Sequence, residues 1–154
     1  MVINILMKAR FAIRVLLIFS LVVSACKSTK IDNPNQPTTI SFGTYGGFAG
    51  SYTEYVITEN GKTFMKTKFD GKLDEMGPIK AEDFTRFMRS LKKFKATKYI
   101  IQDPGNQTFF IRLKENGQLS SEWLWGGNAH EPSAELVSMY RDMFALCKDN
   151  FPIK

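Results

Sequence analysis

Two copies of Glu-Asn-Gly, each set between runs of β-branched and aromatic residues, constrain the fold of this 154-residue chain more than any other feature. The surrounding segments read YVITENGKTFMKTK and FFIRLKENGQLSSEWLW. Asn-Gly is the strongest short signal for a hairpin with a two-residue turn, because both turn positions need positive φ. We therefore predict two β-hairpins, with turns at Asn60-Gly61 and Asn116-Gly117.

An amphipathic helical pattern follows each hairpin, in AEDFTRFMRSLKKF and in PSAELVSMYRDMFALCKDNF. In each segment the apolar residues recur three or four positions apart, which places them on one face of a helix. Pro132 is suited to the first turn of the second helix. The two apolar stripes are Phe84, Phe87, Met88, Leu91 and Phe94, and then Leu136, Met139, Tyr140, Met143 and Cys147.

These elements can bury their apolar faces only by layering. The order strand, strand, helix, strand, strand, helix predicts an α+β fold, with a mostly antiparallel sheet of about five to six strands and both helices packed on one face. Further strands are expected at Thr38–Phe42 and Lys98–Gln102. Alternation along the strands predicts the residues that face inward. They are Tyr55, Ile57, Phe109, Ile111 and Leu113, with Trp123 and Trp125 sharing one side.

The N-terminal segment has the layout of an export signal. Lys8, Arg10 and Arg14 come first, and no acidic residue occurs before Asp32. The apolar run Val15–Val23 is much shorter than the roughly 20 residues that cross a bilayer as a helix. This pattern predicts a secretory signal rather than a transmembrane helix.

At its end, Val23-Ser24-Ala25-Cys26 resembles the lipobox of bacterial lipoproteins. The resemblance implies that Cys26 carries diacylglycerol, that signal peptidase II cleaves before it, and that a fatty acid such as palmitate acylates its new amino group. It divides the chain into a signal peptide (1–25), a lipidated cysteine with a disordered tether (26–37) and a single α+β domain (38–154). The alternative is an ordinary signal peptide, with Cys26 kept as a free or disulfide-bonded thiol.

The tether, KSTKIDNPNQP, is polar and contains two prolines, so it cannot bury apolar area. Lysine rather than aspartate follows Cys26, which in the lipoprotein family implies no retention in the inner membrane. No run of acidic residues follows Cys26, so the sequence gives no support for export to the cell surface. The resemblance therefore implies an outer-membrane lipoprotein facing the periplasm. The chain looks like the small uncharacterised lipoproteins of the Bacteroidota.

The charge balance bears on the partners. The 21 basic and 15 acidic residues give +6, and removal of the leader leaves 18 basic against 15 acidic residues, a net charge of +3. This weak excess in an exported domain argues against nucleic acid as a partner. The expected partners are membrane lipid, through acylated Cys26, and an envelope protein or glycan. We expect a monomer without a cofactor.

The glycine-rich stretch FGTYGGFAGSY, Phe42–Tyr52, is the first candidate binding site. It lacks both the Gly-Lys-Ser/Thr ending of a P-loop and a Gly-x-Gly-x-x-Gly pattern. It therefore predicts a tight connection between strands. The alternative is a loop that displays Tyr45 and Phe48 to a ligand or partner.

The second candidate is SEWLWGGNAHE, where Trp123 and Trp125 project from one face of a strand and Asn128 follows. Such rings suit stacking on a sugar, but a sheet covered by helices needs the same rings for its core. Core packing and a binding platform are thus the two alternatives.

The same stretch holds the chain's one histidine, His130. It is a candidate general base beside Glu122 or Glu131, which would make the protein a small hydrolase. The alternative is a solvated or capping histidine in a loop before a helix.

Metal binding is not expected. One histidine and the single further thiol, Cys147, cannot form a zinc tetrahedron, and we expect that thiol to be buried and inert. Asp70–Glu75 lacks the ligand spacing of an EF-hand and predicts a turn. The basic run Arg89–Lys98 predicts the solvated back of the first helix, or a contact with anionic headgroups.

The leading functional hypothesis is a non-catalytic envelope module that binds a protein, peptide or glycan partner. One alternative is a periplasmic inhibitor that inserts the Gly43–Gly50 loop into the cleft of a hydrolase. The other is the small hydrolase that uses His130.

Overall fold

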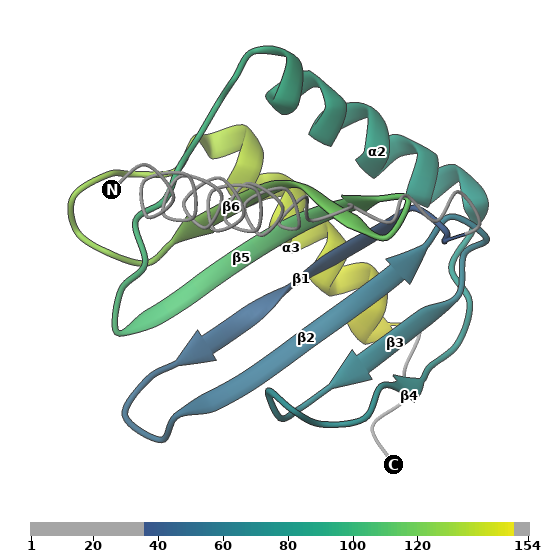
Figure 1. The fold of residues 1–154 in the computed structure, drawn as a ribbon, viewed down its shortest axis with the longest axis horizontal. Helices are drawn as coiled ribbons and strands as arrows, with labels where there is room; N and C mark the ends of the chain where they lie inside the picture. The colour runs from purple at the N-terminus through teal and green to yellow at the C-terminus, as the bar shows by residue number, and fades with distance from the viewer. Residues whose placement is uncertain (1–35, 150–154) are drawn as a thin grey trace, which may run out of the picture. The chain divides into compact units, whose positions relative to one another are not determined.

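The computed structural model describes residues 36–149 (Figure 1). The predicted signal peptide, Cys26 and most of the predicted tether lie outside the described residues. The described part has the predicted α+β fold, with one open antiparallel sheet of six strands in the order β4-β3-β2-β1-β5-β6. The elements are β1 (Thr39–Gly46), β2 (Ser51–Thr58), β3 (Thr63–Lys66), β4 (Asp74–Glu75), α2 (Ala81–Ala96), β5 (Gln107–Glu115), β6 (Gln118–Trp125) and α3 (Ala134–Asp149).

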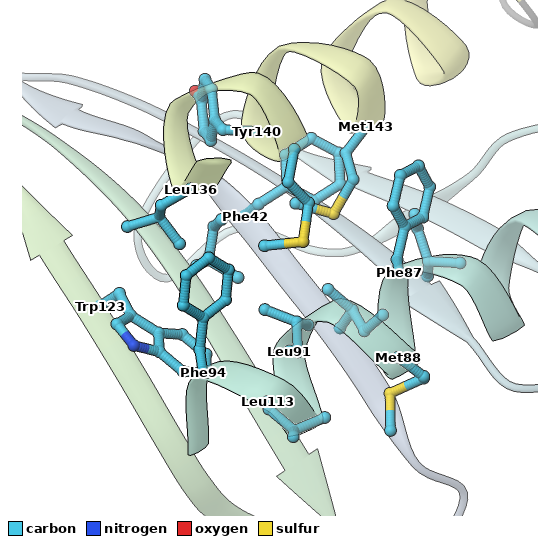
Figure 2. Packing of buried hydrophobic residues seen from close by; sticks show 14 of the residues in the cluster. Phe42, Phe87, Met88, Leu91, Phe94, Leu113, Trp123, Leu136, Tyr140 and Met143 are labelled. Atoms are coloured by element: carbon cyan, nitrogen blue, oxygen red, sulfur yellow. The ribbon is translucent and has the colours of Figure 1, made fainter. Parts of the chain in front are cut away.

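One face of the sheet packs against both helices. On β1, Ile40 and Phe42 point to this face, and both are fully buried. Phe42 pairs with Tyr55 on β2 and with Ile111 on β5, so the predicted alternation of inward positions is confirmed. All ten residues of the two helical stripes are buried in the same core, part of which is seen in Figure 2.

The two Asn-Gly turns differ. Asn116 and Gly117 have φ values of 53° and 74°, as a two-residue turn requires. At the other site four residues separate β2 from β3, and Gly61 alone among them has positive φ, so the prediction of a two-residue turn is wrong there. The Asn60 side chain instead accepts hydrogen bonds from the Thr58 hydroxyl (2.5 Å) and the Lys62 amide (3.3 Å). These local hydrogen bonds hold a wider loop.

The predicted strand at Lys98–Gln102 is also wrong. Lys98 has a φ of 54° and ends α2 in a Schellman arrangement, in which the Tyr99 amide donates to the Phe94 carbonyl at 3.0 Å. What remains of strand character is one isolated parallel bridge from Gln102 to Leu124. By contrast, the strand predicted at Thr38–Phe42 is present and extends to Gly46.

The beginning of α3 corrects a smaller prediction. Pro132 precedes the helix rather than occupying its first turn, because α3 begins at Ala134. Ser133 is the N-cap, and its hydroxyl accepts a hydrogen bond from the Leu136 amide at 3.2 Å.

The exposure of the basic residues on α2 and the burial of the Cys147 thiol agree with the predictions from the sequence. Lys92, Lys93 and Lys95 are exposed on α2, and the Lys93 ammonium pairs with Glu135 of α3 at 3.2 Å. Cys147 is free and fully buried, and burial raises the pKa of its thiol to about 12. The thiol therefore stays protonated and unreactive at neutral pH, as predicted.

Candidate binding site

The glycine-rich stretch forms the hairpin between β1 and β2, in agreement with the predicted tight connection. The loop Gly47-Phe48-Ala49-Gly50 begins and ends with glycines at positive φ, 75° and 60°. The Gly50 amide donates to the Gly47 carbonyl at 3.0 Å, and the Gly47 amide donates to the Asn106 carbonyl at 2.6 Å. Backbone hydrogen bonds thus hold the loop and tie its base to the segment before β5.

Phe48 lies at the tip of this loop with its side chain fully exposed, at a relative exposure of 107%. A single exposed apolar residue is ordinary on a protein surface. Phe48 is unusual in its position, because a large ring at the end of a hydrogen-bonded hairpin can enter a cavity of another molecule. The side chain of Phe48 is thus exposed, as the alternative interpretation of this loop requires, while its display to a ligand or partner stays a prediction.

Tyr45, the other residue proposed for display, lies within β1. Its ring is half-buried and contacts Phe110 of β5, with ring centroids 6.0 Å apart. Tyr45 also pairs across the strands with Tyr52 of β2. It therefore braces the base of the hairpin, and its predicted place at the tip is wrong.

The tryptophans belong to the core. Trp123 and Trp125 are 1% and 7% exposed, so neither ring face is open to a sugar. The Trp123 indole donates a hydrogen bond to the Tyr99 carbonyl at 2.9 Å, and Trp125 stacks on Phe109 with centroids 5.8 Å apart. Of the two alternatives, core packing therefore agrees with the burial of both rings, and the binding platform is wrong.

Glu122 lies on a different element from the other groups proposed for catalysis. It lies on β6 and accepts a hydrogen bond from the Arg112 side chain at 2.6 Å. His130, Glu131 and Asn128 are exposed in the loop before α3. Within residues 36–149, no hydrogen bond or ion pair joins His130 to either glutamate. This arrangement gives the hydrolase hypothesis no support.

Asp103 organises that loop, a role that the sequence analysis missed. Its carboxylate accepts hydrogen bonds from the backbone amides of Ala129 (3.0 Å) and His130 (2.8 Å). The signal was weak, because an Asp before a Pro predicts a turn but not its distant partner.

A pocket of about 380 Å³ lies near the base of the hairpin and was also missed. We call it the aromatic pocket, and it is lined by Gly43, Thr44, Thr53, Tyr55, Phe109, Tyr140 and Phe144. Its walls carry four aromatic rings and four hydroxyl groups but no charged side chain. Burial raises the pKa of Tyr140 to about 12, so its hydroxyl stays protonated. Such a lining suits a neutral ring, from a protein side chain or a sugar.

Comparisons with known proteins add no family. No protein-family model matches the chain, and no curated protein is significantly similar to it in sequence. Across residues 36–149, no group of three or more His, Cys, Asp or Glu residues could hold a metal ion. None of the helices in that range is long and apolar enough to cross a membrane.

Proposed function

We propose that this chain is a lipid-anchored lipoprotein of the cell envelope, whose domain is a non-catalytic module that binds a protein partner through the β1–β2 hairpin. The observation that carries the binding role is the complete exposure of Phe48 at the tip of a hydrogen-bonded loop. The anchor is supported by the sequence Val23-Ser24-Ala25-Cys26 alone.

The energetics of the hairpin favour such a role. Burial of a phenylalanine side chain in a partner contributes roughly 1.5–3 kcal/mol of hydrophobic free energy. Because the loop is already held by hydrogen bonds from the Gly47 and Gly50 amides, little conformational entropy is lost on binding. Aromatic residues that enter a partner's cavity commonly dominate the energy of an interface.

The aromatic pocket offers a second contact for a partner near the β1–β2 hairpin. Thr44 and Thr53, which line it, pair with one another close to the hairpin loop. A partner that encloses Phe48 could place a side chain of its own in this pocket. An inhibitor that inserts the hairpin into the cleft of a hydrolase is one form of the same proposal.

A glycan is the second candidate partner. The aromatic pocket favours it, because its rings and hydroxyl groups match the apolar faces and hydroxyl groups of a sugar. This candidate needs the pocket but not Phe48.

The anchor would restrict where the partner is found. If Cys26 is lipidated, the residues from Lys27 to Pro37 could hold the domain up to roughly 35 Å from the bilayer at about 3.3 Å per residue. We place the protein in the outer membrane, facing the periplasm, and expect its partner there.

Phe48→Ala should reduce capture of the envelope partner at least about tenfold, because the ring supplies the anchoring contact. The measurement is cross-linking and co-purification from the membrane fraction with the full-length, membrane-anchored protein. Phe69→Ala is the matched control, since Phe69 is also largely exposed, at 77%, but lies between β3 and β4. Phe48→Ala should keep its stability within about 0.5 kcal/mol. Phe69→Ala should lose no more than about 1.5 kcal/mol, because the Phe69 ring packs against the Tyr52 ring with centroids 5.5 Å apart.

Equal capture by Phe48→Ala and the wild type would refute docking through the hairpin tip. Titration with peptidoglycan fragments tests the second candidate. If the fragments bind equally well to the wild type and Phe48→Ala, and less well to Tyr140→Phe, the glycan replaces the protein as the proposed partner.

A further inference from the structure

The face of the sheet opposite the helices carries a second pocket, of about 320 Å³. It lies toward the end of β1 that is remote from the hairpin tip, around Thr39 and Ser41. We call it the Ser41 pocket, and it is lined by Gln36, Pro37, Thr39, Ser41, Glu54, Val56, Lys66, Leu73, Lys114 and Gly117.

Ser41 is the feature that requires an explanation. It is 3% exposed, and its hydroxyl is buried without a hydrogen-bond partner among the described residues. A buried hydroxyl without a partner costs about 1–3 kcal/mol, and native proteins leave few of them. Alanine at this position would avoid the cost, so the hydroxyl is suited to a group that enters the pocket.

The charged groups beside Ser41 offer a ligand more hydrogen-bond donors than acceptors, since two lysines and one glutamate line the pocket. The Glu54 carboxylate already accepts a hydrogen bond from the Tyr52 hydroxyl at 2.7 Å. The Lys66 ammonium lies 3.6 Å from the same carboxylate, which is an ion pair but too long for a hydrogen bond. Lys66 is largely buried, with 19% of its side chain exposed, so its charge acts in a partly desolvated setting. Its ammonium also lies over the rings of Tyr52 and Phe69, 5.4 Å and 5.9 Å from their centroids.

The other positively charged side chains near the pocket also favour an anionic ligand. Arg112, which is opposite Ser41 on β5, is engaged by Glu122 at 2.6 Å and by the ring of Phe110 at 4.4 Å. Lys114 lines the pocket and is exposed. The lining thus holds two ammonium groups against one carboxylate, and this excess of positive charge favours an anion.

We propose that the Ser41 pocket binds a small organic carboxylate. The ligand's oxygens accept hydrogen bonds from the Ser41 hydroxyl and the Lys66 ammonium, and its short alkyl body lies against Val56 and Leu73. This site is separate from the hairpin, and the inference does not depend on the proposed function.

Butyrate is the probe, titrated into the full-length protein in detergent micelles at pH 7 and constant ionic strength. We expect saturable shifts of the Ser41 and Lys66 amide resonances in NMR spectra. Ser41→Ala should weaken butyrate binding at least about tenfold without destabilising the unliganded protein, because it removes a hydroxyl that is otherwise unpaired. Lys66→Met should also weaken binding, and Lys62→Met, which removes a lysine paired with Glu75 outside the pocket, should not.

Inorganic phosphate is titrated in parallel to distinguish the anions. Saturation by butyrate but not by phosphate supports the proposal. Saturation by phosphate alone, the absence of saturable shifts with butyrate, or unchanged butyrate binding in Ser41→Ala would each overturn it.

Discussion

Trp123→Ala should lower the free energy of unfolding by about 3–5 kcal/mol, the usual cost of removing a large buried aromatic side chain. The Trp123 ring is 1% exposed and contacts the Phe94 ring of α2, with centroids 6.2 Å apart. Its loss would leave a cavity where the sheet meets that helix (Figure 2). Urea unfolding followed by circular dichroism measures the effect.

Two further variants separate the contributions of Trp123. Trp123→Phe keeps an aromatic ring but removes the N–H that donates to the Tyr99 carbonyl, so it should cost less, about 1–3 kcal/mol. Leu119→Ala changes an exposed residue of the same strand and should cost no more than about 0.5 kcal/mol. A cost below about 1 kcal/mol for Trp123→Ala would contradict the core role of this ring.

Gly43→Ala should be the second most damaging change, at about 3 kcal/mol, because the added methyl group has no space. Gly43 lies in β1 between β2 and β5, and a Cβ there would come within 1.9 Å of the Thr53 carbonyl oxygen. That oxygen belongs to the backbone of a paired strand, so relief requires the strands to separate. Thermal or urea unfolding measures the loss of stability.

Gly47→Ala is the matched control for Gly43→Ala. Gly47 has a φ of 75°, but no atom lies within 4 Å of the position that its Cβ would occupy. The cost should therefore be that of the left-handed conformation alone, roughly 1–2 kcal/mol. A cost for Gly47→Ala equal to or above that for Gly43→Ala would mean that β1 and β2 accommodate the methyl group.

The sequence predicts most of the fold because the signals are local and periodic. The apolar residues from Phe84 to Phe94 and from Leu136 to Cys147 are spaced so that each set lies on one face of a helix, and every residue of these stripes is buried. The turns were harder to predict. At Asn60-Gly61 the side-chain hydrogen bonds of Asn60 determine the conformation of the loop. The apolar run after Lys98 does not form a strand, because the backbone hydrogen bonds that end α2 extend to Tyr99.

The candidate sites were less accessible from sequence. Alternation places Trp123 and Trp125 on one side of β6, but only the packing of α2 and α3 decides that this side is covered. The display of Phe48 could be predicted, because its flanking glycines indicate a tight loop. The Ser41 pocket could not, since a serine in a strand gives no sign that its hydroxyl lacks a partner.

The proposed lipid anchor would decide which molecules the hairpin can meet, and intact-mass analysis of the mature protein from membranes tests it most directly. We predict a chain that begins at Cys26 and carries diacylglycerol and a further fatty acyl group. The Cys26→Ser protein should lack this modification and should no longer be found in the membrane fraction. A mature chain that begins elsewhere or carries no lipid, or a Cys26→Ser protein that stays with the membrane, would contradict the proposal.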